Sequence, residues 1–573
     1  MNASTVRERR GTGSALISVL LVLTAVILLA VTGLYLTNTN LAIAGNIVGN
    51  TIAKSNAESG IDATIAMLYA NFESTGNLPG SIQAPAVNLS TADVDYGLES
   101  VVPHGNRVHL KVIGYGPNNA EYLSEALVEF KGTNVRGPIP FGGGVVACEG
   151  LDLLGGGMID GFDSRVGPYD QRHRLRSAQI RTTMPNAHIH LDGGTNVYGD
   201  IFSTGGVTID AGASVYGDIV ASDDVLISSA GTFDGEIHTT GNLSFSNTAS
   251  VSGNVSSNGE LRFDNVATVE GNAASGADMV FTNNGRIEGN AHVGGEYLPV
   301  RADYKHVQGT VRENAGSVSN QPVAPEVCDP IDIETQILAL QDQLRATDKP
   351  NIVVGNYPKV NWRISPSTLT SFDDTWNVKE WVQEAGASTI HLGGSEIPVL
   401  QTGDFHLANG EIRVREGHVV LFIDGNFETS GGGKMVIERG SSLTLYITGK
   451  TRLGSSFRIV DEYGFPVSAT LADTQKPTFS IYSAHTGQMA RWNERQTAGV
   501  VLEGSTDVPV NVYAPNTGIY VSAGGDIYGA LRGKEVAVVG GAGIHYDVAL
   551  GEIEHGSPNE QQINFEFEII SRR

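Results

Sequence analysis

The feature that most constrains the fold is a repeat of 18 residues in the middle of the chain. A glycine recurs at this interval without exception, with an apolar residue two positions before it and a second apolar residue two positions after it. The glycines are Gly199, Gly217, Gly235, Gly253, Gly271 and Gly289. A strict period of this length is typical of a solenoid in which short units stack on their neighbours.

The alternation inside each repeat predicts a parallel β-solenoid with three short strands per turn. Paired apolar residues such as Val207 and Ile209 recur with the same period and predict inward-facing columns. Equivalent residues would stack about 4.8 Å apart, so six turns extend roughly 29 Å. We expect glycine at a corner because the bend requires permissive backbone dihedrals. The repeats cover 190–300, within a solenoid domain predicted over 136–328.

The position after each repeat glycine is polar in every turn. It is acidic at Asp200, Asp218 and Glu236, and asparagine at Asn254, Asn272 and Asn290. Stacked asparagines predict an amide ladder. Stacked carboxylates about 5 Å apart repel one another unless they are solvated or bridged by a cation such as calcium. Both alternatives stay open for Asp200, Asp218 and Glu236, and calcium is the one cofactor that the sequence suggests.

The N-terminal segment is basic and then apolar. Arg7, Arg9 and Arg10 precede an uncharged run in which residues 14–36 are long enough to cross a bilayer as a helix. Arginines on this side predict a cytoplasmic N-terminus, with the rest of the chain outside the cytoplasm. Because no proline occurs from 37 to 72, we expect one helix over 14–72, roughly 88 Å long.

Three interpretations of this segment differ in how the chain is processed. A cleaved secretory signal has a shorter apolar core followed by a small-residue cleavage site, which this segment lacks. A plain membrane anchor fits its hydropathy. A prepilin leader, cut on the cytoplasmic side between Gly13 and Ser14 or between Gly11 and Thr12, also fits and would keep the helix.

The first 60 residues resemble PilX-type minor pilins of the type IV pilus. The run Arg10-Gly-Thr-Gly-Ser-Ala-Leu-Ile17 and the later Ala57-Glu-Ser-Gly-Ile61 carry this resemblance. It implies a leader over 1–13, removal of that leader by prepilin peptidase, and insertion in the inner membrane before assembly with other pilins. Most pilins carry a glutamate as the fifth residue after the cut, where this chain has Ser18. A subunit lacking that charge suits a special position such as the filament tip.

Beyond the helix, alternation predicts a small antiparallel β domain over 73–135. A linker over 76–90 precedes the hairpin of Arg107–Ile113 and Leu123–Phe130. A connector over 329–400 contains a short amphipathic helix within 332–345, whose apolar face carries Ile333, Ile337, Leu340 and Leu344.

β sequence without a strict period then returns and predicts a β-helical domain over 401–573. Its close resembles an uncharacterised β-helical domain found at the C-terminus of PilX-like proteins. The motifs that carry this resemblance are Tyr513-Ala-Pro-Asn516, Gly529-Ala530 with Gly533-Lys534, and Ile544-His-Tyr-Asp547. That family has no known catalytic role.

Charge and cysteine content exclude some classes of partner. The net charge of −25 argues against nucleic acid and anionic lipid surfaces. The two cysteines, Cys148 and Cys328, lie in no CxxC motif, which argues against a zinc site. In an oxidising compartment they would form one disulfide; otherwise they are two buried thiols.

Parallel β-helices include polysaccharide lyases and hydrolases, so an enzyme is one alternative. The candidate acid and base residues are Asp160, Asp163 and Asp170, and the ladder of Asp200, Asp218 and Glu236. His188 and His190 share one strand face and could bind a metal, although no third ligand is evident. His545 and Asp547 lie in a motif that is more typical of turn and packing residues. The sequence contains no hydrolase, zinc-protease or P-loop motif, and each candidate has a structural explanation.

The sequence therefore predicts a mainly β protein with a long N-terminal transmembrane helix, a small antiparallel sheet and a large parallel β-helix. We expect a non-enzymatic minor pilin-like subunit, at the tip of a type IV pilus or related filament. Its head would serve adhesion to a glycan or surface, or filament initiation. The alternatives are a single-pass cell-surface protein outside any filament and a polysaccharide-active enzyme.

Overall fold

The computed structural model describes most of the chain, in two compact units. The described residues are 12–75, 96–104, 107–134, 139–344, 351–355, 361–365, 388–392, 395–454, 456–470, 476–491, 494–504, 507–552 and 563–572. One unit comprises residues 1–135 with 561–573, and the other, called the head, comprises 136–560. The predicted leader up to Gly11 and the predicted linker 76–90 lie outside the described residues.

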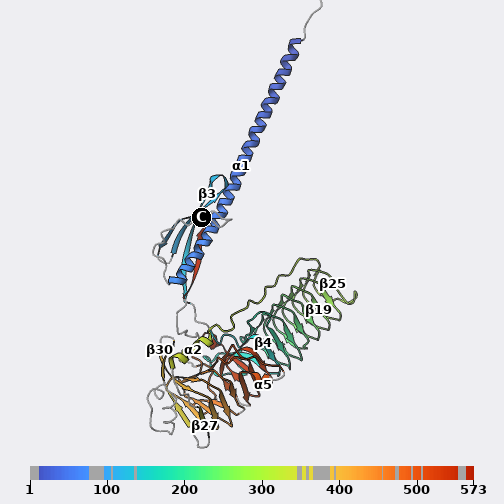
Figure 1. Ribbon diagram of the computed structural model, residues 1–573. Coiled ribbons are helices and arrows are strands. Elements are labelled where there is room, and N and C mark those ends of the chain that lie inside the picture. The colour runs from blue at the N-terminus through green and yellow to red at the C-terminus, as the bar shows by residue number, and fades with distance from the viewer. Residues whose placement is uncertain are drawn as a thin grey trace, which may run out of the picture. The chain divides into compact units, whose positions relative to one another are not determined.

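Helix α1 (Thr12–Thr75) is one unbroken rod, as Figure 1 shows. Its 64 residues would extend about 96 Å at 1.5 Å per residue. The threonines of the apolar half bond to the carbonyl one turn back; Thr37 Oγ1, for example, donates to the Gly33 oxygen over 2.8 Å. These bonds satisfy the hydroxyl groups without a partner outside the helix.

The second half of α1 packs on an antiparallel sheet of β1 (Tyr96–His104), β2 (Arg107–Gly116), β3 (Ala120–Asn134) and β47 (Ile563–Arg572). Ile61 of α1 is buried against Leu110 and Val112 of the sheet. Glycine permits the close approach, because a Cβ on Gly114 would lie less than 3.0 Å from the backbone of Ala53 and Ala57. The hairpin of β2 and β3 occupies the segments whose alternation predicts it.

The last strand belongs to this sheet. β47 pairs antiparallel with β3, from Ala126 opposite Arg572 to Asn134 opposite Ile563. The predicted extension of the β-helical domain to 573 is therefore wrong for the final strand. Its alternating sequence fits either sheet, and only the tertiary pairing decides between them. The head is consequently an insertion between two neighbouring strands, β3 and β47.

The head is a parallel β-solenoid with three faces, which confirms the predicted β-helix. Strands 18 residues apart pair in register, as in Ile219 with Ile237, Val225 with Leu243, and Val215 with Phe233. The strands of the first face are β9 (Ile201–Ser203), β12 (Ile219–Ala221), β15 (Ile237–Thr239), β18 (Val255–Ser257), β21 (Ala273–Ser275) and β24 (Ala291–Val293). The strands of the second are β7 (His188–Leu191), β10 (Val207–Ile209), β13 (Val225–Ile227), β16 (Leu243–Phe245), β19 (Leu261–Phe263) and β22 (Met279–Phe281). The strands of the third are β8 (Asn196–Val197), β11 (Ser214–Val215), β14 (Thr232–Phe233), β17 (Ser250–Val251), β20 (Thr268–Val269) and β23 (Arg286–Ile287).

The repeat glycines are required for space more than for backbone conformation. Only Gly199 among the six has a φ in the left-handed half of the map, at +153°. At Gly217, Gly235, Gly253, Gly271 and Gly289, an added Cβ would lie less than 3.0 Å from the carbonyl oxygen of the glycine one turn earlier. The expectation of permissive dihedrals is thus wrong at five of the six positions. Stacked corners approach too closely for any side chain.

The C-terminal half of the head continues the same three faces with longer turns. Phe405 pairs with Phe427, and Leu421 with Leu445. Two faces comprise β27 (Ile352–Gly355), β31 (Phe405–Ala408), β34 (Phe427–Ser430), β37 (Thr451–Leu453), β40 (Val500–Gly504) and β43 (Ile519–Ala523), and β30 (Ser395–Thr402), β33 (His418–Ile423), β36 (Ser442–Ile447), β39 (Phe479–Ser483) and β42 (Asn511–Ala514). The third comprises β28 (Asn361–Ile364), β32 (Glu411–Val414), β35 (Lys434–Ile437) and β38 (Arg458–Val460), then β41 (Val508–Pro509), β44 (Ile527–Tyr528) and β46 (Ile544–Asp547). Among the described residues of the predicted connector 329–400, α2 (Ile333–Leu344) is helical as expected, whereas β27, β28, β29 (Ser388–Leu392) and most of β30 are strands.

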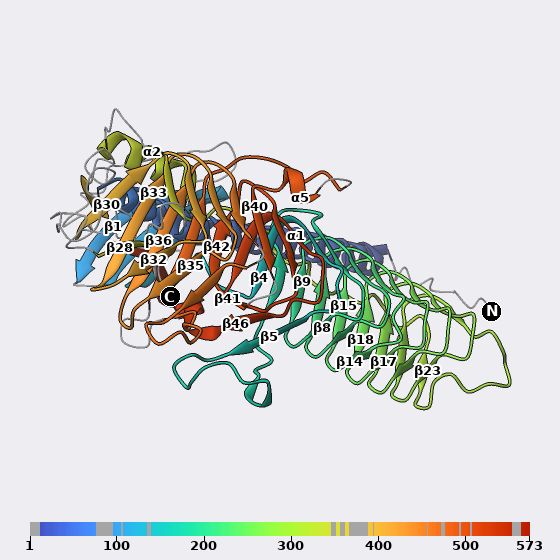
Figure 2. The same ribbon diagram turned by 90° about the horizontal axis from the view of Figure 1, so that it is seen from below.

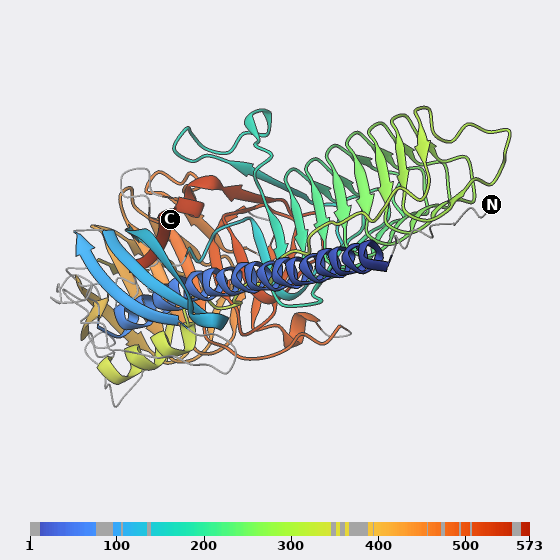
Figure 3. The same cartoon turned by 90° about the horizontal axis from the view of Figure 1, so that it is seen from above.

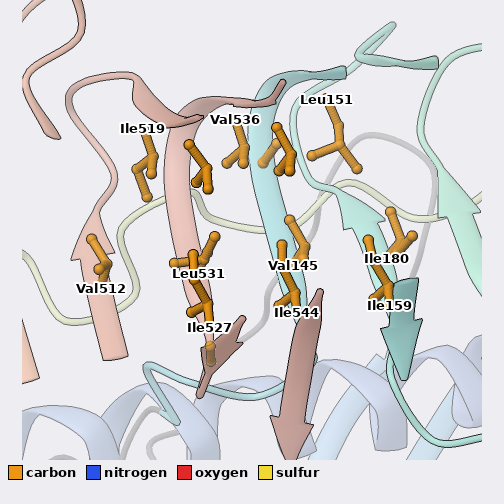
Figure 4. Close-up of a cluster of buried hydrophobic side chains, with 14 of the residues drawn as sticks. Val145, Leu151, Ile159, Ile180, Val512, Ile519, Ile527, Leu531, Val536 and Ile544 are labelled. Atoms are coloured by element: carbon orange, nitrogen blue, oxygen red, sulfur yellow. The ribbon is translucent and has the colours of Figure 1, made fainter. Parts of the chain in front are cut away.

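The two halves of the solenoid meet where the head begins, at a junction that we call the seam. Strand β4 (Val145–Leu153) pairs on one edge with β45 (Leu531–Val538) and on the other with β6 (Ile180–Thr182) and β7. On the third face, β5 (Met158–Phe162) lies between β46 and β8. Figure 4 shows side chains from both halves, including Val145, Ile180 and Leu531, meeting in one core. The stack is continuous although its strands are far apart in sequence (Figure 2).

An extended segment returns the chain from the outer end of the 18-residue repeats to the seam, and is visible in Figure 1 as the long connection toward α2. We call residues 315–328 the strap. Ala315 N–H donates to the Val293 oxygen, and Asn320 bonds to Asn258. The strap ends at a disulfide between Cys328 and Cys148 of β4, whose Cα atoms are 5.4 Å apart. The disulfide fixes the strap at the seam.

Replacing both cysteines with serine should lower the free energy of unfolding by about 2–5 kcal/mol, because the crosslink closes a long loop in the unfolded chain. Urea denaturation of the full chain measures this loss. Dithiothreitol should destabilise the natural protein and leave the double variant unchanged. A natural protein insensitive to the reductant would contradict the disulfide.

Gly235→Ala should cost about 1–3 kcal/mol, because its Cβ would overlap the Gly217 carbonyl. Gly150→Ala is the matched control, since the nearest atom to its Cβ is the His188 oxygen at 3.8 Å. Equal melting temperatures for the two variants would refute the steric explanation.

Candidate functional site

The first half of α1 is an exposed apolar surface. An 18-residue window within Ile17–Ile65 has a mean hydropathy of 2.8, and none of it is buried. Leu29, for example, is 73% exposed. The helix is thus long and apolar enough to cross a membrane. Gly13, Ser14 and Ser18 lie in α1, and Gly11 lies outside the described residues, so cleavage stays a prediction.

The corner residues after the repeat glycines form a ladder of hydrogen bonds between the side chain of one turn and the backbone N–H of the next. Asp200 Oδ1 accepts from Asp218 N–H over 2.9 Å, and Asp218 Oδ1 accepts from Glu236 N–H over 2.8 Å. Asn254 and Asn272 continue the same pattern toward the next turn. Asp200, Asp218, Asn254 and Asn272 therefore have the same structural role, because one side-chain oxygen of each accepts from the backbone N–H of the following corner.

Glu236 ends the acidic part of this ladder. Its carboxylate accepts from Asn254 Nδ2 over 2.6 Å and contacts His238 Nε2 at 2.9 Å. Hydrogen bonding by His238 and then Asn254 lowers the pKa of Glu236. In the described part of the chain, no three His, Cys, Asp or Glu side chains converge as a metal site. Calcium binding at Asp200, Asp218 and Glu236 stays an untested prediction.

A second corner ladder was not predicted. Asn242 N–H donates to Asp224 Oδ1 over 2.7 Å, and Glu260 N–H donates to Asn242 Oδ1 over 2.8 Å. The C-terminal half repeats the arrangement, with Asn426 N–H bonded to Asp404 Oδ1. Acidic and amide residues at intervals of 18 were a visible signal for this second ladder.

In the described part of the chain, His188 and His190 gather no third ligand and have separate partners. His188 Nε2 lies 3.0 Å from Thr208 Oγ1, and burial lowers the His188 pKa. His190 lies between two carboxylates, 3.2 Å from Asp210 and 3.6 Å from Asp152. Each histidine therefore contacts polar side chains of the neighbouring turns.

Two of the catalytic candidates meet inside the seam. His545 Nδ1 lies 2.6 Å from Asp160 Oδ1, and both side chains are completely buried. Tyr169 donates to the other Asp160 oxygen over 2.6 Å and stacks on the His545 ring at 3.8 Å between centroids. His545 Nε2 lies 3.3 Å from Asp526 Oδ2. We call these four residues the seam cluster.

The remaining acidic candidates have separate partners. Asp163 pairs with Arg165, and a hydrogen bond from Arg172 lowers the Asp170 pKa to about 2. Asp547 accepts from Thr470 Oγ1 and from the backbone of Ser164. Asp170 and Asp163 belong to the loop between β5 and β6, which stands off the stack in Figures 2 and 3. General acid–base chemistry requires groups that reach a substrate, and the buried His545–Asp160 pair does not.

The seam cluster should make stability depend on pH. Burial lowers the pKa of His545, but the hydrogen bond to Asp160 and the charges of Asp160 and Asp526 outweigh it, so the net pKa is raised. The contact with His545 is the first cause of a lowered Asp526 pKa. The contribution of His545 to the free energy of unfolding is therefore complete below the unfolded-state pKa of about 6.5. It is lost as pH rises through the raised pKa of the folded state. The Asp526 contribution is lost as pH falls through its lowered pKa.

His545→Gln should lower the free energy of unfolding by about 3–5 kcal/mol at pH 6, because Asp160 loses its buried charged partner. The loss should shrink toward pH 8. Urea denaturation at both pH values measures it, with the half-exposed His190→Gln as the control expected to cost under about 1 kcal/mol. A loss independent of pH would show that His545 is held as a neutral side chain.

Comparisons with known proteins match two separate stretches of the head. A family model described as a domain of unknown function (DUF7305) matches residues 385–553. The bactofilin model, described as polymer-forming cytoskeletal, matches residues 179–274, which lie in the 18-residue repeats. Each match covers less than half of the chain. No curated protein matches it.

Among solved structures, the competence-associated pilin ComZ from Thermus thermophilus is 11% identical, over 92% of this chain and 97% of that chain. The TM-score is 0.21, and at this value the likeness carries no argument about fold or function.

Proposed function

We propose that this protein is a minor pilin-like subunit of a type IV pilus or related filament that displays a non-enzymatic β-solenoid head. The exposed apolar half of α1 would first anchor the chain in the inner membrane and then pack with other pilins. The basic residues before it and the resemblance of the first 60 residues to PilX-type minor pilins support this proposal.

The observation that carries the proposal is the insertion of the head between β3 and β47. The helix-and-sheet unit contains α1, the hairpin strands and β47, and it is a compact unit separate from the head. Such a unit can serve as an assembly module while the inserted domain varies. A free-standing surface solenoid has no need for a helix-and-sheet unit into which it is inserted.

We place the subunit at the filament tip. A head comprising residues 136–560 would obstruct lateral neighbours along a thin filament, whereas the tip leaves room for it. Ser18, at the position of the usual pilin glutamate, supports a place where no neighbouring N-terminus requires a charged partner. The long solenoid faces would then bind a surface or glycan.

The mature N-terminus tests processing. Mass spectrometry of the protein from cells with active prepilin peptidase should find Ser14 or Thr12 as the first residue. Replacing Gly11 and Gly13 with valine should prevent cleavage, so that the leader stays on the chain. Gly33→Val is the control and should still be cleaved, because an added Cβ at Gly33 has no neighbouring atom within 4 Å. An intact leader on the natural chain would contradict the proposal.

Filament membership is tested separately. Sheared filaments should contain the processed protein at low abundance, with the head labelled at filament ends by electron microscopy. Processed protein found only in membranes would instead support a single-pass surface protein.

A further inference from the structure

The seam carries a pocket of about 600 Å³ that no role described above uses. The Gly142–Gly143 turn, β4, β6, β45 and the end of the strap surround it. All of these belong to the head. Chain segments far apart in sequence therefore build one cavity, which exists only when the two halves of the solenoid join.

Arg532 lies in the wall of this pocket, and one of its guanidinium N–H groups is unsatisfied among the described residues. Its exposure is 7%, and its Nε atom has no hydrogen-bond partner among the described residues. Burial lowers the Arg532 pKa. Glu326 and Asp329 attract the guanidinium from a distance, and each has a nearer partner: Glu326 pairs with Arg181, and Asp329 accepts a hydrogen bond from the Tyr513 hydroxyl over 2.6 Å.

Two more unsatisfied donors line the same pocket. Arg181 Nε and Ser177 Oγ are buried without a hydrogen-bond partner in the described part of the chain. The carboxylates in the lining, Glu326 and Glu552, pair with Arg181 and Arg165. Unsatisfied buried polar groups destabilise the folded protein, and charged ones do so more strongly. A ligand that supplies negatively charged acceptor oxygens would remove this destabilisation.

The rest of the lining indicates what else the ligand carries. Gln179 adds an amide, and Val146, Val327 and Pro330 add apolar surface. The volume lies in the range of small-molecule sites and exceeds what a simple inorganic anion needs. A sugar acid combines a carboxylate, several hydroxyl groups and an apolar ring face.

We propose that this pocket binds the carboxylate of an acidic sugar, a hexuronic acid or a sialic-type acid. Arg532 pairs with the carboxylate, since a guanidinium matches its two oxygens. Ser177 and Arg181 donate to the remaining oxygens, and the ring lies on the apolar wall. The inference supplies a ligand class for the proposed adhesive head and rests on that function only for its biological setting.

Calorimetric titration of the full chain in detergent tests the ligand class. The probes are D-glucuronate and N-acetylneuraminate, their methyl esters, acetate and inorganic phosphate. We expect at least one of the two acids to bind. Its methyl ester should bind at least about tenfold more weakly, because the ester lacks the negative charge that would pair with Arg532. No binding by either acid, equal binding by ester and acid, or equally tight binding of acetate or phosphate would overturn the proposal.

Variants test the residues. Arg532→Gln should weaken binding of the preferred acid at least about tenfold, and Ser177→Ala should weaken it about threefold or more. Lys534→Gln is the matched control, because Lys534 lies on the same strand, pairs with Glu149 at 3.3 Å and does not line the pocket. Unchanged affinity in Arg532→Gln, or equal losses in Lys534→Gln, would overturn the assignment. If Arg532→Gln fails to fold, the comparison of acid and ester on the natural protein still tests whether the pocket recognises the carboxylate. Neither arm depends on leader cleavage or filament assembly.

Discussion

The pairing of β4 on both of its edges is the interaction on which the head depends. β4 bonds to β45 on one side and to β6 and β7 on the other, so it joins turns that are hundreds of residues apart. Without it, each half of the solenoid would expose an open strand edge at its end, which is a site for aggregation. The seam also brings together the disulfide, the seam cluster and the pocket around Arg532.

The order of events along the chain explains why the seam needs reinforcement. The chain enters the stack at its middle, builds the 18-residue turns outward and returns through the strap. It then builds the C-terminal half from the far end back to β4. The closing contacts have a large sequence separation and an entropic cost that local contacts do not offset. The disulfide from Cys148 to Cys328 and the buried His545–Asp160 pair both act at this closure.

The sequence contains most of what is regular in this structure. The period of 18 predicts the three-strand turns, and the uncharged N-terminal run predicts a long helix, because both patterns are local and repeated. The seam was not predictable in this way. β4 does not lie 18 residues from its partners β6 and β7, and its other partner, β45, is far away in sequence. β47 has an alternation that suits any antiparallel sheet.

The site chemistry was also only partly accessible. Asp160 and His545 could be named as candidates, but their pairing follows from tertiary contact and shows them to be buried. The sequence does not identify Arg532 as a ligand-binding residue, because an arginine in a strand gives no sign of whether a carboxylate will lie beside it. The steric cause of the repeat glycines likewise required the distance between neighbouring turns.

Hydrogen exchange in β4 tests the continuous solenoid most directly. The backbone amides at this junction exchange only when the stack opens, such as Val145 N–H of β4 bonded to the Gln179 oxygen and Leu531 N–H of β45 bonded to the Gly144 oxygen. Measured by mass spectrometry on the full chain, β4, β6 and β45 should exchange together and more slowly than β25 (Tyr297–Leu298), which lies near the outer end of the repeats. Rapid exchange in β4 or β45, with slow exchange elsewhere in both halves, would mean that the head is two separate solenoids and would contradict this account.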